Sequence, residues 1–137
     1  MPWTVDYISE LGIVNSTYVG NVTADEFRMG TVRSLNLARE NNTRLFLIDD
    51  SKWEGGTSVF DLYKLPALFI ELGFERGSKG ALILPPSGNA ESTDAHFFET
   101  VCVNQGWLVK VFADRQEAIN WLTTRKLSNK PDARDGL

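Results

Sequence analysis

Two short runs of the chain are apolar at nearly every position, Leu45–Ile48 and Ala81–Leu84. A strand with one solvated face alternates apolar and polar residues, whereas a strand that is buried on both faces does not alternate. Strands of the second kind belong to parallel sheets that other elements cover on both sides. The two runs therefore predict the central strands of an α/β domain.

The segments around these runs supply the remaining elements. Trp3–Ile8 and Ile13–Val19 alternate apolar and polar residues, which predicts an antiparallel pair at the margin of the sheet. Each later strand is followed by a segment whose apolar residues have helical spacing, and the last strand is expected at Trp107–Phe112. The order ββαβαβαβα predicts a single α/β domain over residues 1–124, with a mixed, mostly parallel sheet covered by helices. Residues 125–137 are polar and aperiodic, and we expect a flexible tail there.

Composition and charge limit the class of protein and its compartment. The chain has 137 residues, of which 42% are hydrophobic and 23% charged, as in soluble globular domains. A formal net charge of −4 argues against a general binder of nucleic acids or anionic membranes. Cys102 is the only cysteine, and we find neither a secretory signal nor an apolar run that could span a bilayer. We expect a cytoplasmic protein without a nucleic-acid partner or stable membrane insertion.

The first two helices have recognisable features. Thr23–Glu26 has the pattern of a capping box. Spacings of three and four predict the core-facing residues of the helix that follows: Ala24, Phe27, Thr31, Leu35 and Ala38. Gly30 lies inside this helix, where glycine costs about 1 kcal/mol relative to alanine, so we expect a close packing contact there. The second helix, predicted over Val59–Leu72, contains Pro66 and is expected to kink at this residue.

Polar residues follow the first apolar run and are predicted to form a loop at the carboxyl end of a strand, opposite the start of the second helix. In α/β sheets, ligands bind in crevices at such strand ends. The two carboxylates there could bind a metal ion or act as acid and base, or they could simply end the strand. The hydroxyls could accept a phosphoryl group at the helix N-terminus, or cap the helix. These residues define a candidate regulatory or ligand loop: Asp49, Asp50, Ser51, Thr57 and Ser58.

No catalytic motif is found in the chain. A Gly-x-Ser-x-Gly sequence is absent, and His96 is the only histidine that could serve as a base. His96 and Cys102 lie on different faces of a predicted helix, and Cys102 is expected to be a small core residue. We therefore predict a protein without enzymatic activity, cofactor or metal site.

The second predicted helix is apolar nearly all around. One face must cover the sheet, and the excess apolar surface could be buried under neighbouring elements, form a homodimer interface or line a groove for a small apolar ligand. The candidate interface or groove residues are Leu65, Leu68, Phe69 and Leu72.

The order of elements, with Asp49 ending the third strand and Ser58 at the following helix start, resembles the SpoIIAA-like proteins of the STAS (anti-sigma-factor antagonist) and SEC14-like superfamily. The final segment Val109–Leu122, a strand followed by Ala-Asp-Arg-Gln-Glu-Ala-Ile-Asn-Trp-Leu, looks like the common close of these proteins. The likeness covers about Val5 to Leu122.

This resemblance implies a non-enzymatic module that binds a partner protein or a small apolar ligand. Anti-sigma-factor antagonists carry a phosphoacceptor at the start of the second helix, and the resemblance makes Ser58 its best counterpart. The leading hypothesis is a regulatory protein-binding module, homodimeric through the second helix. The alternatives are a carrier of an apolar ligand or lipid in a groove under that helix, and a metal-dependent enzyme that uses Asp49 and Asp50.

Overall fold

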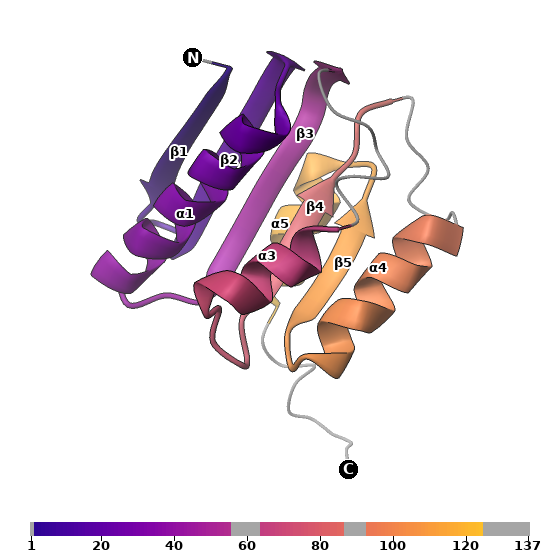
Figure 1. The fold of residues 1–137 in the computed structure, drawn as a ribbon. Helices are drawn as coiled ribbons and strands as arrows, with labels where there is room; N and C mark the ends of the chain where they lie inside the picture. The colour runs from indigo at the N-terminus through magenta and orange to yellow at the C-terminus, as the bar shows by residue number, and fades with distance from the viewer. Residues whose placement is uncertain (1, 56–63, 87–92, 125–137) are drawn as a thin grey trace.

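The computed structural model describes residues 2–55, 64–86 and 93–124. These ranges contain five strands and four helices. In chain order the elements are β1 (Trp3–Ile8), β2 (Ile13–Asn21), α1 (Ala24–Glu40), β3 (Leu45–Gly55), α3 (Leu65–Leu72), β4 (Lys79–Ile83), α4 (Thr93–Asn104), β5 (Leu108–Phe112) and α5 (Arg115–Thr123) (Figure 1). The polar tail predicted over residues 125–137 lies outside the described residues.

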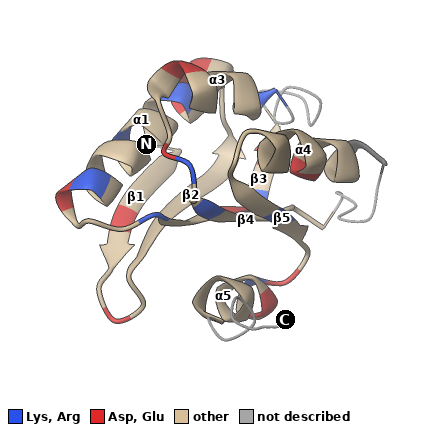
Figure 2. Ribbon diagram, turned by 90° about the horizontal axis from the view of Figure 1, so that it is seen from below, with Lys and Arg blue, Asp and Glu red and all other residues tan. Residues whose placement is uncertain are grey.

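The five strands form one sheet in the order of the sequence, β1-β2-β3-β4-β5. β1 pairs with β2 antiparallel, and the other three pairs are parallel. From β2 to β5, each crossover adds the next strand on the same side of the previous one. When all such crossovers have the usual right hand, their helices lie on one face of the sheet. Figure 2 shows this arrangement: α1, α3 and α4 cover one face, and α5 lies on the other. The predicted α/β class with a mixed, mostly parallel sheet is confirmed.

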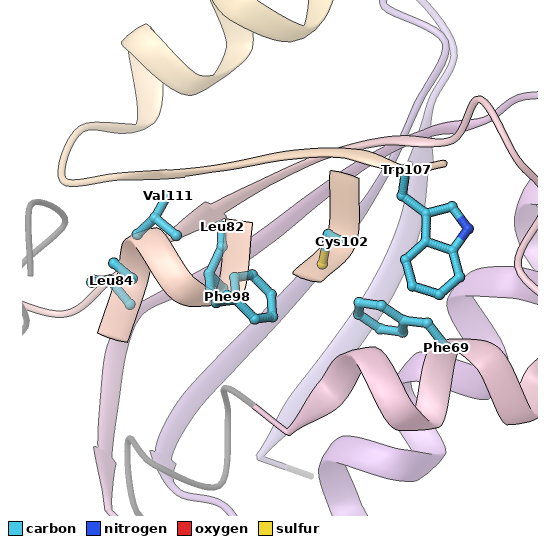
Figure 3. Packing of buried hydrophobic residues seen from close by; sticks show 8 residues of the cluster. Phe69, Leu82, Leu84, Phe98, Cys102, Trp107 and Val111 are labelled. Carbon is cyan, nitrogen blue, oxygen red and sulfur yellow. The ribbon is translucent and has the colours of Figure 1, made fainter. Parts of the chain in front are cut away.

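The core has one layer on each side of the sheet. Beneath α5, Ala118 and Leu122 pack on Leu47, Ala81 and Ile83 of the central strands. On the opposite face, α3 and α4 enclose a cluster around Phe69, Leu82, Phe98, Cys102 and Trp107 (Figure 3). Cys102 is fully buried, as predicted, and burial together with the nearby carboxylate of Glu99 raises the pKa of its thiol to about 12. This thiol is therefore a core side chain and not a nucleophile.

β3 is longer than the sequence analysis predicted. The segment after Ile48 was expected to be a loop, but the strand continues to Gly55. It continues because β2 extends far enough to pair with it: Gly20 lies opposite Trp53, and the side chain of Trp53 is buried. The register shifts between these two strands. Thr17 pairs with Asp49 and Val19 pairs with Lys52, so β3 contains one more residue than β2 between these two pairs. This is a β-bulge, which changes the direction in which the side chains beyond it point.

Two details of the helices also differ from expectation. Ala24 is exposed and does not face the core, although the predicted capping box of Thr23 and Glu26 is present. Pro66 lies in the first turn of α3, where a backbone N–H has no intrahelical partner, and not in the interior of this helix. Residues 59–63 of the predicted helix, on the other side of the expected kink, lie outside the described residues.

The close contact expected at Gly30 is found. A β-carbon added to this residue would lie 2.2 Å from the hydroxyl oxygen of Tyr18 and 2.9 Å from its Cζ. Glycine at this position thus lets the ring of Tyr18, which is only 2% exposed, pass between α1 and β2. The packing of a helix against the sheet outweighs the lower helix propensity of glycine here.

We expect Gly30→Ala to destabilise the protein by about 1–3 kcal/mol, because the added methyl group overpacks the contact with Tyr18. Helix propensity alone predicts the opposite sign. Urea denaturation measures the change, with Met29→Ala on the exposed side of α1 as the control. Adding Tyr18→Phe should restore part of the loss, since it removes the nearest atom. A neutral or stabilising Gly30→Ala would show that this contact does not constrain the helix.

Candidate functional site

Asp50 is the most unusual polar residue of the described structure. Its side chain is completely buried, and neither carboxyl oxygen has a hydrogen-bond partner. Burial, and to a smaller extent the charge of Asp49, raises the pKa of this carboxyl to about 8. The group is therefore mostly protonated at neutral pH. A buried polar group without a partner costs about 1–3 kcal/mol, and strongly shifted groups are concentrated at functional sites.

Asp49 and Asp50 point to opposite faces of the sheet because successive side chains of a strand alternate. Asp49 lies on the α5 face, where Arg115 forms an ion pair with it at 2.8 Å. The backbone N–H and the hydroxyl of Ser51 also donate to Asp49, at 2.9 and 2.6 Å. Asp50 faces the side of α1. The two carboxylates therefore do not converge on one metal ion in this arrangement.

A group of buried hydroxyls lies between α1 and β2 on the Asp50 side of the sheet. The hydroxyls of Thr31 and Ser16 act to lower the pKa of Tyr18. Burial and the nearby Asp50 outweigh this effect and raise the pKa of Tyr18 well above its ordinary value. The hydroxyls of Thr31 and Ser34 donate to backbone carbonyls one turn earlier in α1, each at 2.8 Å. The layer under α1 is thus unusually polar for a helix–sheet interface.

A cavity of about 50 Å³ opens beside these hydroxyls, between the sheet and helices α1, α3 and α4. One wall carries the four side chains Ser16, Tyr18, Thr31 and Ser34. Residues 78–80, Ser-Lys-Gly, form a short part of the lining. The rest of the lining is apolar and mainly aromatic: Phe27, Phe46, Ile48, Leu65, Phe69, Phe74, Phe98, Trp107 and Val109. An apolar cavity with a few polar groups on one side has the composition of a small-molecule site.

The four residues singled out on the second helix have different surroundings. Leu65 and Phe69 line the cavity, and Phe69 is 7% exposed. Leu72 packs beside Phe74 on the cluster under α1, and Leu68 is half-buried. The exposed apolar residue of α3 is Ile70, at 53%. Burial therefore accounts for much of the apolar excess of this helix.

The candidate loop is only partly described. Asp49, Asp50 and Ser51 belong to β3, whereas Thr57 and Ser58 lie outside the described residues, so the predicted phosphoacceptor has no structural description. Sequence reasoning did not select the hydroxyl wall. Its signal was nonetheless present, since Thr31 and Ser34 are polar residues one helical turn apart, close to the glycine, on the face of α1 that covers the sheet.

Two further observations limit the classes of site. Among residues 2–55, 64–86 and 93–124, no three His, Cys, Asp or Glu side chains are grouped closely enough to hold a metal ion. None of the helices in the same ranges is both long and apolar enough to cross a membrane.

The chain matches no protein-family model, and no curated protein matches it. Among solved structures, it is similar to the crystal structure of an uncharacterized protein from the DUF3478 family with a SpoIIAA-like fold, from Shewanella loihica PV-4. The two share 18% sequence identity over 88% of this chain and 91% of that chain, with a TM-score of 0.48.

We expect the stability of the folded protein to fall as the pH rises from about 4 to about 8. The folded state keeps the Asp50 proton up to a pKa of about 8, whereas the unfolded chain releases it near 4, so the contribution is complete below pH 4 and is lost by pH 8. Asp50→Asn should remove this dependence. Its stability relative to wild type should increase by at least about 2 kcal/mol between pH 5 and pH 8.

Chemical denaturation at one-unit pH intervals measures this difference. Glu10→Gln, in the exposed turn between β1 and β2, is the control for loss of one carboxylate. A difference between Asp50→Asn and wild type that stays constant across this range would mean that Asp50 ionises normally in the folded protein.

Proposed function

We propose that the protein is a non-catalytic STAS/SpoIIAA-like binding module that holds a small apolar ligand, bearing one hydrogen-bonding group, between α3 and the sheet. The observation that carries this proposal is the cavity with one hydroxyl wall and a remaining lining that is mostly aromatic and aliphatic. The sequence resemblance to SpoIIAA-like proteins supports the non-catalytic part, and the single buried cysteine is consistent with the cytoplasm.

The size of the cavity limits the ligand. A volume of about 50 Å³ is smaller than the roughly 150 Å³ that holds a benzene ring, so a ring-sized ligand requires α3 to move outward or the cavity to be widened. α3 is a helix of 8 residues whose outer surface includes the exposed side chain of Ile70. A lipid with a long chain would require a larger rearrangement than a single ring.

The second candidate function is binding of a protein partner, which includes a homodimer. It is favoured by three exposed apolar side chains on the outer surfaces of α3 and α4: Ile70 at 53%, Phe97 at 65% and Val103 at 51% exposure. The two helices contact each other and lie on the same face of the sheet (Figure 1). A regulatory role through phosphorylation of Thr57 or Ser58 would belong to this second function.

Ligand binding can be tested by changing the cavity volume in both directions. Val109→Ala widens the cavity, and we expect phenol and toluene to bind this variant at least ten-fold more tightly than wild type. Phenol should bind more tightly than toluene because the hydroxyl wall offers it a hydrogen bond. Gly80→Val should abolish binding, since its side chain would project into the cavity from β4. Calorimetry and methyl chemical shifts provide the measurements.

Gly80→Ala is the matched control for backbone effects at this position. Its β-carbon would lie 3.7 Å from Val109 Cγ2 and 3.9 Å from the carbonyl oxygen of Phe46, which are ordinary contacts. We expect it to fold normally. If neither probe binds wild type or Val109→Ala, or if both still bind Gly80→Val with unchanged affinity, the cavity is not a ligand site.

Dimerisation should be tested at Ile70 and not at Phe69, because Phe69 is buried and its replacement by a charged residue would disrupt the core. If the apolar surface of α3 and α4 forms a dimer, Ile70→Glu and Phe97→Glu should each give a folded monomer in analytical ultracentrifugation. Met29→Glu, at a residue that is 50% exposed on α1, is the control. A dimer that survives both changes would exclude this interface.

A further inference from the structure

Four of the five buried side-chain atoms without a hydrogen-bond partner in the described structure belong to one region, and the fifth is Asn15 Oδ1. The indole nitrogens of Trp3 and Trp53 and both carboxyl oxygens of Asp50 are shielded from solvent and have no hydrogen-bond partner there. Asp50 is fully buried, and Trp53 is 7% exposed. Folded proteins satisfy most of their buried polar groups, so three such side chains in one layer require an explanation.

The strand register places Trp3 and Asp50 close together. Trp3 lies directly opposite Tyr18 in the pairing of β1 with β2. Across β2, Thr17 pairs with Asp49 and Val19 with Lys52, so the bulge sets Asp50 beside Tyr18. Neighbouring strands are about 4.8 Å apart. Trp3, Tyr18 and Asp50 thus form a row across three strands, on the sheet face that α1 covers.

Trp53 joins the same region because of the bulge. It pairs with Gly20, and its ring meets the edge of Phe27 in α1 with a centroid distance of 6.2 Å. Trp3 and Trp53 pack in one cluster with Tyr18, Val22 and Phe27. Both indoles and the carboxyl of Asp50 therefore lie beneath the amino-terminal part of α1.

The chemistry of these groups selects the partner. An indole N–H can only donate a hydrogen bond, whereas the carboxyl of Asp50, even when protonated, keeps a carbonyl oxygen that can accept one. A hydroxyl oxygen can accept from both indoles and donate to Asp50, so it satisfies all three side chains. An ammonium group cannot accept from the indoles. An anion would be placed in apolar surroundings close to the negative charge of Asp49, which is unfavourable.

We propose that Trp3, Asp50 and Trp53 form a binding site for the hydroxyl group of a small neutral molecule. This hydroxyl could belong to a free polyol or to the end of an amphipathic alcohol whose apolar part lies in the cavity. The second source is structurally reasonable because Tyr18 and Phe27 border both the site and the cavity. Of the two sources, only the amphipathic alcohol depends on the proposed function of the cavity.

The indole N–H signals of the four tryptophans report directly on this site. We would titrate the protein, labelled with ¹⁵N, with glycerol and with 1-hexanol. The signals of Trp3 and Trp53, assigned with Trp3→Phe and Trp53→Phe, should shift together and saturate. The signal of Trp107 should stay constant with glycerol, because its indole already donates to the carbonyl oxygen of Phe74 at 3.3 Å. Trp107 also lines the cavity, so its signal should move with 1-hexanol when the apolar chain enters there.

Two controls make the test specific for a hydroxyl group. Methyl pentyl ether is an isomer of 1-hexanol that can accept but not donate a hydrogen bond, and it should bind at least ten-fold more weakly. Asp50→Leu removes the acceptor while leaving an apolar side chain, and it should abolish the shifts while the backbone amide spectrum shows an intact fold. Asp50→Asn, which keeps an acceptor oxygen, should retain part of the response.

Each result has a defined meaning. Saturation by glycerol identifies a free polyol site, whether or not phenol or toluene enters the cavity. Saturation by 1-hexanol alone, weakened by Gly80→Val, identifies the hydroxyl end of a ligand held in the cavity. The proposal is wrong if neither alcohol shifts the two indole signals with saturation, if the ether matches 1-hexanol, if hexylamine saturates them at lower concentration, or if Asp50→Leu, with its fold intact, responds like wild type.

Discussion

The parallel pairing of β2 with β3 is the interaction on which the rest of this structure depends. It continues past Thr17 and Asp49 through a bulge, and so it keeps a polar segment of the chain inside the sheet. Asp50 points toward α1 because it follows Asp49, which faces α5, and the bulge turns Trp53 to the same side as Asp50. Without this extension, Asp50 would lie in a loop with access to water, and its pKa would have no reason to rise.

The layer between α1 and the sheet combines close packing with unusual polarity. Gly30 lets the ring of Tyr18 pass under the helix, and Ser16, Thr31 and Ser34 surround the same space with hydroxyls. A layer filled only with aliphatic side chains would be more stable, because buried polar groups contribute little net energy even when they are paired. Polar groups kept at such a cost are typical of sites that bind a ligand.

The cavity and the Asp50 region are neighbours with different chemistry. The cavity offers aromatic and aliphatic walls, which recognise the shape of an apolar molecule. The Asp50 region offers two donors and a carboxyl group, which recognise hydrogen-bonding capacity. Tyr18 and Phe27 separate the two and border both. A single amphipathic ligand could therefore use both regions, and two smaller ligands could use them independently.

Much of the fold could be predicted from residue patterns, because those patterns reflect local physics. The apolar runs Leu45–Ile48 and Ala81–Leu84 specified buried strands, and Thr23 and Glu26 specified a helix start. The end of β3 was wrong, because strand length depends on what the neighbouring strand offers for pairing. Pro66 was expected inside a helix but lies in the first turn of α3, and the effect of a proline depends on where in the helix it lies.

By itself, the sequence determined the α/β class, the antiparallel margin formed by β1 and β2, and the burial of Cys102. It also marked Asp50 and Gly30 as positions of interest, through a charge beside an apolar run and a glycine within a helix. Only the tertiary structure decided that Asp50 is buried without a partner, that Tyr18 fills the space at Gly30, and that Trp3 and Trp53 lie close by. These facts depend on the register between strands that are distant in sequence, which no local pattern encodes.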